Sequence, residues 1–347
     1  MENKQFLIVG AGVAGISLAK YLSDQGHSIT LVDNGKNRSS TIAAGMINPI
    51  VFRRMTKSWR VDELLPYAVQ FYTDLEKECG SQFFHIITIR RVFSSEQEKD
   101  FWLEKQHLPE FSNYLTPVSE NDEQFSSCHN PYGSGRVKNS AYVSTIEFLK
   151  CAKNWFAANQ HLLEEEFDYD ALDPVLLTYK NKLFDDVIFC EGVEVIHNPW
   201  FSNIPVNHTQ GETLTIKSDE IPEEESLNRK CFLLPIGNKT FRVGATYKWD
   251  TYDDEITEEA RKELEEKLAV LTDASYTVID HKAGIRPTTM DRRPIIGTHD
   301  TFKGLHVLNG LGTKGYMIAP LIAKELGEYL LTGKPMHPEV SLDRTKK

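Results

Sequence analysis

The chain has 347 residues, 40% of them hydrophobic, so it is long enough to form two lobes around a buried cofactor. Its formal net charge of -11 and pI near 5.5 disfavour a nucleic-acid or anionic-membrane partner held by electrostatic attraction. The five scattered cysteines form no CxxC motif and no zinc-type cluster, so we expect reduced thiols, no metal site and a cytoplasmic protein.

The first elements along the chain are a strand at residues 6–9, a tight turn, a helix to about residue 23 and a second strand at 29–32. The turn is a GxGxxG sequence, whose glycines permit a sharp bend and a close approach of a pyrophosphate to the backbone. The start of the helix supplies free N–H groups and a positive dipole end. We therefore predict dinucleotide binding by Gly10, Ala11, Gly12, Val13, Ala14 and Gly15, with Asp33 and Asn34 at the ribose. A glycine turn without a ligand is the alternative.

The middle of the chain mixes helices and strands. An amphipathic helix is predicted at 61–78, a strand at 84–93, polar loops to about 140, and a helix at 144–156 behind a Ser144–Glu147 capping box. Two apolar runs follow at 175–179 and 187–190, the second closed by Gly192. No stretch of the sequence is apolar for long enough to span a bilayer.

From about residue 200 to 280 the pattern changes to alternating strands. They are expected at 212–216, 231–234, 240–245 and 276–279, with one charged helix at 258–271. This mixture indicates an antiparallel sheet in a separate lobe.

The last elements are a strand at 305–308, a turn with three glycines and a helix at 317–331. Gly310, Gly312 and Gly315 would bring the backbone against a planar ring. A helix start at this point can also stabilise the negative charge that a flavin gains on reduction. A glycine-rich turn before a packing helix is the alternative.

These motifs resemble the D-amino-acid oxidase superfamily of FAD-dependent oxidoreductases, which includes glycine oxidase and sarcosine oxidase. The resemblance covers nearly the whole chain and depends on the first glycine turn and on residues 40–49, 231–247, 283–297 and 304–320. It implies FAD held noncovalently, because no cysteine lies near Pro287, where relatives attach the flavin. The cofactor-binding residues that it adds are Ala43, Ala44, Gly45 and Met46 against the flavin, Gly310, Gly312, Thr313, Lys314, Gly315 and Tyr316 along its pyrimidine side, and Gly192.

The expected fold class is α/β, a Rossmann-like FAD-binding domain with a second, antiparallel-sheet α+β substrate domain. The FAD-binding domain would be discontinuous, formed by residues 1–80, 141–198 and 281–347, and the substrate domain would comprise 81–140 and 199–280. The sequence carries no signal for an oligomeric state.

Three cationic residues are candidates for catalysis. Arg286 precedes Pro287, so its backbone is biased toward an extended form, and it could grip a substrate carboxylate with two hydrogen bonds. An internal ion pair with Asp291 or another acid is the alternative for Arg286. Arg242 matches the position where sarcosine oxidase-like proteins carry a lysine thought to assist oxygen, and a solvent-facing arginine is its alternative. Lys314 could place a cation near the ring, and a surface lysine is its alternative.

The expected function is oxidation of the C–N bond of a small amine or amino acid by hydride transfer to flavin, with O2 as acceptor and H2O2 as product. Several motifs also resemble the oxidase domain of the bifunctional bacterial enzyme that processes carboxymethylaminomethyl-uridine in tRNA, so removal of that carboxymethyl group is an alternative. The basic group Arg53, Arg54, Lys57 and Arg60 could receive RNA, although pairing with nearby acids explains it more simply. A flavin dehydrogenase that uses another acceptor is the third possibility.

Overall fold

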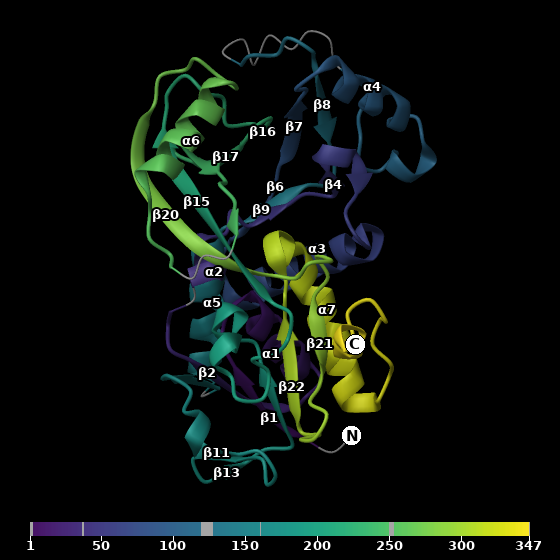
Figure 1. Ribbon diagram of the computed structural model, residues 1–347, viewed down its shortest axis with the longest axis vertical. Helices are drawn as coiled ribbons and strands as arrows, with labels where there is room; N and C mark the ends of the chain where they lie inside the picture. Colours follow the sequence, from purple (N-terminus) through teal and green to yellow (C-terminus); the bar gives the residue numbers. More distant parts are fainter. Residues whose placement is uncertain (1–2, 37, 119–127, 160, 250–252, 347) are drawn as a thin grey trace.

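The computed structural model describes residues 3–36, 38–118, 128–159, 161–249 and 253–346. Figure 1 shows two β-sheets stacked along the long axis of the molecule, with the long helices α1, α3, α5 and α7 around the lower sheet. The long strand β20 descends from the upper sheet toward the centre, so the two sheets meet in the middle of the molecule.

The lower sheet has the strand order β10-β2-β1-β14-β22-β21, and only its β21–β22 edge pair is antiparallel. Its strands are β1 (Gln5–Val9), β2 (Ser28–Asp33), β10 (Leu162–Glu164), β14 (Asp186–Phe189), β21 (Ile295–Thr298) and β22 (Leu305–Asn309). The central strands β1 and β14 are apolar and buried, because helices or loops cover both faces of a parallel sheet. The predicted strands at 6–9, 29–32, 187–190 and 305–308 are confirmed, whereas the sequence predicts neither β10 nor β21.

Four long helices surround this sheet: α1 (Val13–Asp24), α3 (Val61–Cys79), α5 (Thr145–Ala158) and α7 (Gly315–Thr332). Helices α1, α5 and α7 contact its strands, and α3 packs on α7 and α5. Helices α1 and α7 pack so closely that a Cβ atom at Gly327 would lie 2.4 Å from the ring of Tyr21. Each of the four confirms a predicted helix, and α7 begins two residues earlier than predicted, at Gly315.

The capping box predicted at the start of α5 is wrong. Ser144 stands at the N-cap but makes no side-chain capping bond, and its Oγ atom lies 3.1 Å from Nε2 of His85. Glu147 accepts a hydrogen bond from Ser81 Oγ at 2.9 Å. Both side chains thus bind tertiary partners, which the local pattern cannot show.

The upper sheet has the order β19-β15-β18-β17-β16-β7-β8, with β20 paired to β15, and all its neighbours are antiparallel except β7 and β16. Its strands are β7 (Thr88–Val92), β8 (Ser134–Val137), β15 (Asn207–Lys217), β16 (Glu225–Asn228), β17 (Phe232–Gly237), β18 (Thr240–Gly244), β19 (Lys248–Trp249) and β20 (Thr277–Thr288). The predicted strands at 212–216 and 276–279 exist, but both are much longer than predicted.

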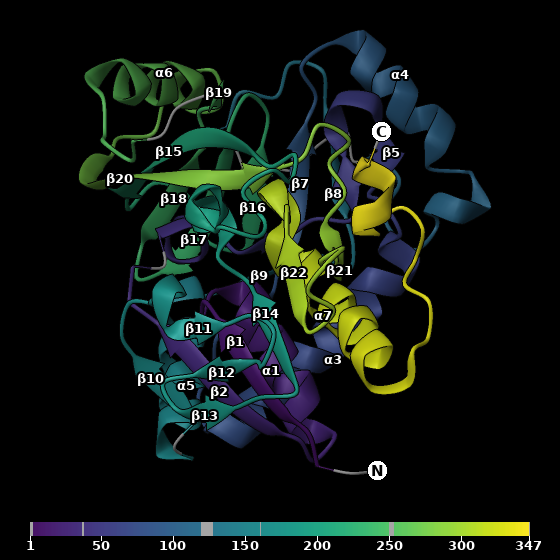
Figure 2. The ribbon, with the colours of Figure 1, turned by 60° about the horizontal axis from the view of Figure 1, so that its bottom comes forward.

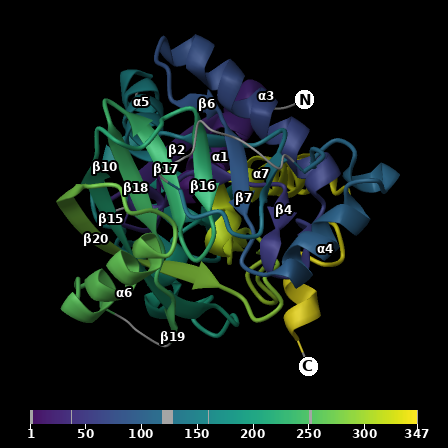
Figure 3. The same cartoon turned by 90° about the horizontal axis from the view of Figure 1, so that it is seen from above.

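Two helices flank the upper sheet. Helix α6 (Glu258–Ala269) confirms the charged helix predicted at 258–271. It buries Leu264 and Leu268 against the sheet and lies outside β15 and β20 (Figure 2). Seen from above, α4 (Glu96–Lys105) lies on the other side of the molecule, beyond β7 (Figure 3). The sequence predicts polar loops where α4 lies. Its only buried residue is Trp102, so an apolar stripe is missing from the sequence.

Shorter elements complete the fold. They are α2 (Arg38–Ile42), β3 (Met46–Ile47), β4 (Ile50–Val51), β5 (Thr56–Lys57), β6 (Phe84–Ile86), β9 (Ala141–Val143), β11 (Leu172–Asp173), β12 (Thr178–Tyr179) and β13 (Lys182–Leu183). The predicted strand at 84–93 is divided between β6 and β7, which belong to different sheets. The apolar run at 175–179 is mostly a turn, with Val175 and Leu176 exposed.

The architecture is α/β, a Rossmann-like parallel sheet with a second, mostly antiparallel α+β region, as the sequence predicts. The upper sheet takes its strands from residues 88–137 and 207–288, and the division of the chain into two domains stays a prediction. Among the helices of the described ranges, none combines the length and apolar character needed to cross a bilayer.

Candidate functional site

A cavity of about 800 Å³ lies at the carboxyl ends of the parallel strands, where the two sheets meet. Such a crevice is the usual ligand site of an open α/β sheet, and its volume is typical of cofactor sites. Its walls come from the first glycine turn, from Lys36 and residues 39–48, from residues 190–197, from β15 and β20, and from residues 245–247 and 308–316.

The first glycine turn has the geometry of a diphosphate-binding loop. Gly10 has a φ of +97°, and a Cβ at Gly15 would lie 1.8 Å from the carbonyl oxygen of Gly10. Gly12, Val13 and Ala14 line the cavity at the start of α1. The N-cap residue Gly12 has no side chain to cap the helix, and Ser40 Oγ accepts a hydrogen bond from Val13 N at 3.1 Å. The positive end of the helix dipole therefore faces the cavity, where an anion would be stabilised.

The predicted ribose-binding carboxylate lies behind this turn and is buried. Asp33 Oδ1 accepts a hydrogen bond from Ala11 N at 2.9 Å, and Oδ2 accepts from Gly35 N at 3.0 Å and from Lys153 Nζ at 2.5 Å. Asn34 is exposed and does not line the cavity. Asp33 therefore supports the turn in this conformation, and its contact with a ribose stays a prediction.

The segment predicted to lie against the flavin does line the cavity. Ala43, Ala44, Gly45 and Met46 all contribute to its wall. Gly45 has a φ of +69°, and a Cβ there would lie 2.0 Å from the carbonyl oxygen of Val143. Only glycine fits at this position, so the segment can pack directly against the backbone of Val143 in β9.

The second glycine turn reaches the same cavity from the far end of the sequence. Gly312, Thr313, Lys314, Gly315 and Tyr316 line it. Tyr316 Oη donates a hydrogen bond to Ser40 O at 2.8 Å, which joins this turn to the segment preceding Ala43. The structure thus brings the two glycine turns together, and both present a helix start to the cavity.

The remaining predicted residues shape the walls in other ways. Gly192 lines the cavity with a φ of +58°, and its carbonyl oxygen accepts a hydrogen bond from Asn309 Nδ2 at 2.8 Å. Gly10, Ala11, Gly15 and Gly310 lie behind the wall.

Lys314 is not a surface lysine. Its Nζ atom donates to Asn48 O at 2.7 Å and to Ser58 Oγ. Burial lowers the pKa of Lys314 to about 7, and no carboxylate of the described residues pairs with it. The cavity thus contains an amine that changes its charge near neutral pH.

Arg286 lines the cavity. The alternative of an ion pair between Arg286 and Asp291 is wrong, because Asp291 pairs with Arg344 at 3.1 Å. The guanidinium of Arg286 lies 5.4 Å from the centre of the Tyr247 ring, and Nη1 donates to Gln210 O at 3.3 Å. Burial lowers its pKa, and within the described ranges no acid forms an ion pair with it. A half-buried cation without an acidic partner is suited to an anionic ligand.

Arg242 does not face solvent, contrary to its alternative. Its Nη1 atom donates a hydrogen bond to Ala43 O at 2.7 Å, and burial lowers its pKa. Arg242 itself does not line the cavity, so it acts on the wall from behind by holding the Ala43 carbonyl.

Two of the four residues of the basic group pair with acids. Lys57 pairs with Asp62, and Arg60 pairs with Glu325 at 2.5 Å. Arg53 and Arg54 are exposed.

Sequence reasoning missed several residues of the wall. Glu191 lies two residues after the end of β14, in the region where parallel sheets place functional groups. Burial raises its pKa to about 7 while it accepts hydrogen bonds from Tyr169 Oη and, at 2.8 Å, from Asn198 Nδ2. Tyr247 gave no local signal, because only folding brings it over Arg286.

Metal chemistry has no site in the described part of the chain, where no group of three or more His, Cys, Asp or Glu residues could hold an ion. The five cysteines are all free thiols.

Comparisons with known proteins agree with this geometry. A family model described as FAD dependent oxidoreductase matches residues 5–329. The chain is 23% identical to glycine oxidase of Bacillus subtilis, covering 99% of this chain and 95% of that one. It is 22% identical to the tRNA 5-methylaminomethyl-2-thiouridine biosynthesis bifunctional protein of Legionella pneumophila, covering 85% of this chain but only 46% of that protein. Its fold is similar to the crystal structure of iminodiacetate oxidase from Chelativorans sp. BNC1, with a TM-score of 0.80, 17% identity and 98% of both chains covered.

The cavity fits FAD on the evidence of its own residues. The helix start at Gly12 suits a diphosphate, the small residues Ala43, Ala44 and Gly45 on the wall suit a flat ring, and the helix start at Gly315 suits the ring's pyrimidine side. With a family model that matches nearly its whole length, the chain belongs to the FAD-dependent oxidoreductases, and FAD is its cofactor.

Proposed function

We propose that this protein oxidises the C–N bond of a small amine or amino acid by hydride transfer to the flavin, with O2 as acceptor and H2O2 as product. The resulting imine would hydrolyse in water. The observation that carries the proposal is Arg286, a half-buried guanidinium on the wall of the FAD cavity with no acidic partner among the described residues. A substrate with a carboxylate would supply the missing anion.

The chain's own residues position the reactants in this proposal. Bound FAD supplies the hydride acceptor. Gly12, Val13 and Ala14 would bind its diphosphate, and residues 43–46 and 312–316 would enclose its ring. Arg286 would hold the substrate carboxylate, so that the carbon beside the nitrogen lies over the ring. Lys314 and Arg242 would place positive charge beside the ring and behind residue 43.

Similar proteins support this substrate class. One relative is named glycine oxidase and one structural neighbour iminodiacetate oxidase, and both names denote small substrates with an amine and a carboxylate. The FAD is expected to be noncovalent, so it should leave the protein on acid denaturation.

The test is anaerobic mixing of the purified protein with glycine, sarcosine, iminodiacetate and D-amino acids. We expect at least one of them to bleach the yellow colour of the flavin, and air to restore the colour with formation of peroxide. If none of the panel reduces the flavin, the amine-oxidase proposal is lost. Slow restoration in air would favour a dehydrogenase with another acceptor.

A second candidate is removal of the carboxymethyl group from carboxymethylaminomethyl-uridine in tRNA. Tyr247 on the cavity wall is 42% exposed, and Trp249, 45% exposed, packs edge-on against it at 5.2 Å. Exposed aromatic rings can stack on a base held near Arg286. The net charge of -11 argues against RNA binding. A binding titration with tRNA at low salt decides, since an absence of binding would remove this candidate.

A further inference from the structure

Residues 334–346, which follow α7, pack along the edge of the lower sheet, and we call them the post-helix segment. Ile296 N donates to Val340 O at 2.9 Å, and Ser341 pairs with Ile296 in a parallel bridge. Val340 is fully buried, and a Cβ at Gly297 would lie 2.5 Å from the Cβ of Leu342. The segment is therefore docked on β21 by backbone pairing and by apolar contact.

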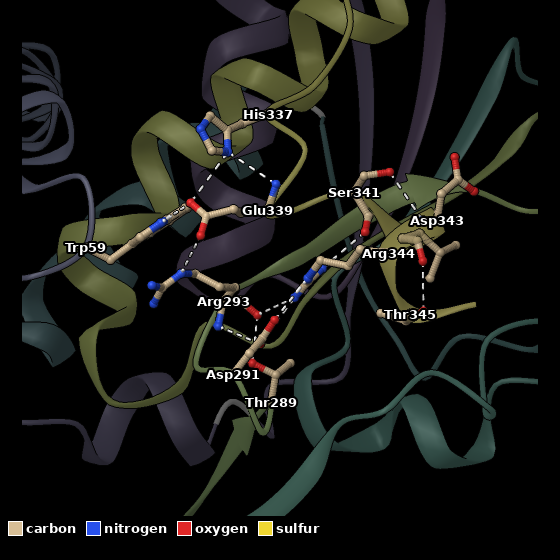
Figure 4. Close-up of polar contacts among 11 residues, drawn as sticks. Trp59, Thr289, Asp291, Arg293, His337, Glu339, Ser341, Asp343, Arg344 and Thr345 are labelled. Atoms are coloured by element: carbon tan, nitrogen blue, oxygen red, sulfur yellow. Dashed lines mark hydrogen bonds and ion pairs between the residues drawn. The ribbon is translucent and has the colours of Figure 1, made fainter. Parts of the chain in front are cut away.

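One arginine of this segment binds the loop that joins β20 to β21 (Figure 4). Arg344 Nε lies 3.1 Å from Asp291 Oδ2, and Nη2 donates to Arg293 O at 3.0 Å. The same carbonyl oxygen accepts from Thr289 Oγ1 at 2.7 Å. A single guanidinium thus holds the loop at two points, and this loop follows directly after the strand that carries Arg286.

A glutamate of the segment binds a second part of the chain. Glu339 Oε2 accepts from Trp59 Nε1 at 2.8 Å, and Glu339 Oε1 lies 3.7 Å from Arg293 Nε. The Arg293 guanidinium lies 4.9 Å from the centre of the Trp59 ring. Figure 4 shows Trp59, Arg293 and Glu339 in mutual contact.

Both targets adjoin the turn at Gly310–Gly315. A Cβ at Gly310 would lie 2.7 Å from the Thr289 methyl group, so the β20–β21 loop presses against the turn. Ser58, the neighbour of Trp59, accepts a hydrogen bond from Lys314 Nζ. The post-helix segment therefore holds two stretches of chain that both contact the turn.

We propose that Arg344 and Glu339 are positioning residues that fix the Gly310–Gly315 turn, and through it the FAD ring. This inference rests on the placement of the ring against that turn under the proposed function. Neither side chain lines the cavity, so they act through Asp291, Arg293 and Trp59. Loss of their charges should loosen the turn, weaken FAD binding and shift the visible absorption of the bound flavin.

The test compares two double variants of the full chain. Arg344→Gln with Glu339→Gln removes the contacts to the loop and to Trp59, whereas the control, Asp343→Asn with Lys346→Gln, removes a pair in the same segment that lies 2.6 Å apart. We expect the dissociation constant of FAD to rise about tenfold in the first variant, since partly exposed charged contacts contribute modestly, and less than about twofold in the control. The melting temperatures of the two apo-proteins should agree.

An equal dissociation constant and an equal flavin spectrum in both double variants would overturn the proposal. If the first variant does not fold, Trp59→Phe replaces it, because this change removes the indole donor to Glu339 and keeps an aromatic ring near Arg293. It should raise the dissociation constant roughly threefold, and a wild-type value would count against the proposal. Should the wild-type protein itself bind no FAD, the proposed function fails instead, so the two failures are distinct.

Discussion

At the scale of single residues, Arg286 gives the sharpest test of the substrate class. Replacing it by Leu removes the half-buried cation, so we expect kcat/KM for an amino-acid substrate to fall by about 100-fold or more, while FAD stays bound. Arg286→Lys should recover only part of the loss, because an ammonium cannot form two parallel hydrogen bonds with a carboxylate. Steady-state peroxide formation measures the change. Lys282→Leu is the matched control, since it removes an exposed cation from the same strand and should leave the rate unchanged.

Lys314 gives a prediction about pH. Its pKa in the folded protein is about 7, below the ordinary 10.5, so the folded state carries the cost of a buried ammonium below pH 7. Between pH 7 and 10.5 Lys314 is protonated in the unfolded chain but neutral in the folded protein. The cost of burying the ammonium therefore falls, and the free energy of unfolding increases, as the pH rises. Lys314→Met should therefore stabilise the apo-protein more at pH 6 than at pH 9. The gain in the free energy of unfolding should differ between the two pH values by up to about 2 kcal/mol. Thermal unfolding at both values measures it, and a mutational effect that is independent of pH contradicts the assigned burial.

At the scale of elements, substitutions at two glycines distinguish the role of the first glycine turn, which would bind the cofactor, from that of β15, which pairs with the strand that carries Arg286. Gly15→Ala places a methyl group 1.8 Å from the Gly10 carbonyl oxygen, so α1 cannot pack on β1 and FAD binding should be lost. Gly211→Ala places one 1.8 Å from Arg286 Nη2, so the guanidinium must move while the turn stays intact. We expect Gly211→Ala to retain FAD and to raise KM about tenfold or more. FAD absorbance and steady-state kinetics on both variants check this, and loss of FAD from Gly211→Ala would refute the separation.

The same elements show how far the sequence is predictive. The β1–α1–β2 unit is readable because an apolar run, three glycines and Asp33 lie in one local pattern. Strand β20 cannot be read from the sequence in this way, because Pro287 suggests the end of a strand. Among the described strands, β20 pairs with β15 alone, and a strand at the edge of a sheet tolerates a proline. Tyr247 and Glu191 also escape prediction, because tertiary packing alone brings them to the cavity.

At the scale of the whole molecule, FAD should stabilise the fold. Its site takes residues from both ends of the sequence, so binding connects segments that an unfolded chain keeps apart. At FAD concentrations 100-fold above the dissociation constant we expect a gain of about 2.7 kcal/mol in the free energy of unfolding. Calorimetry of apo-protein and FAD-loaded protein measures it as a higher melting temperature. Identical melting curves would mean that the cavity is not a binding site.

The contact between Tyr316 and Ser40 has a consequence for biosynthesis. A ribosome makes the first glycine turn some 300 residues before the second, and β1 finds its neighbour β14 only after about 180 residues have been added. The apolar faces of the early sheet therefore stay uncovered for most of translation, which exposes nascent chains to aggregation. Chaperones that shield such chains should increase the yield of active enzyme more than an excess of riboflavin in the growth medium does.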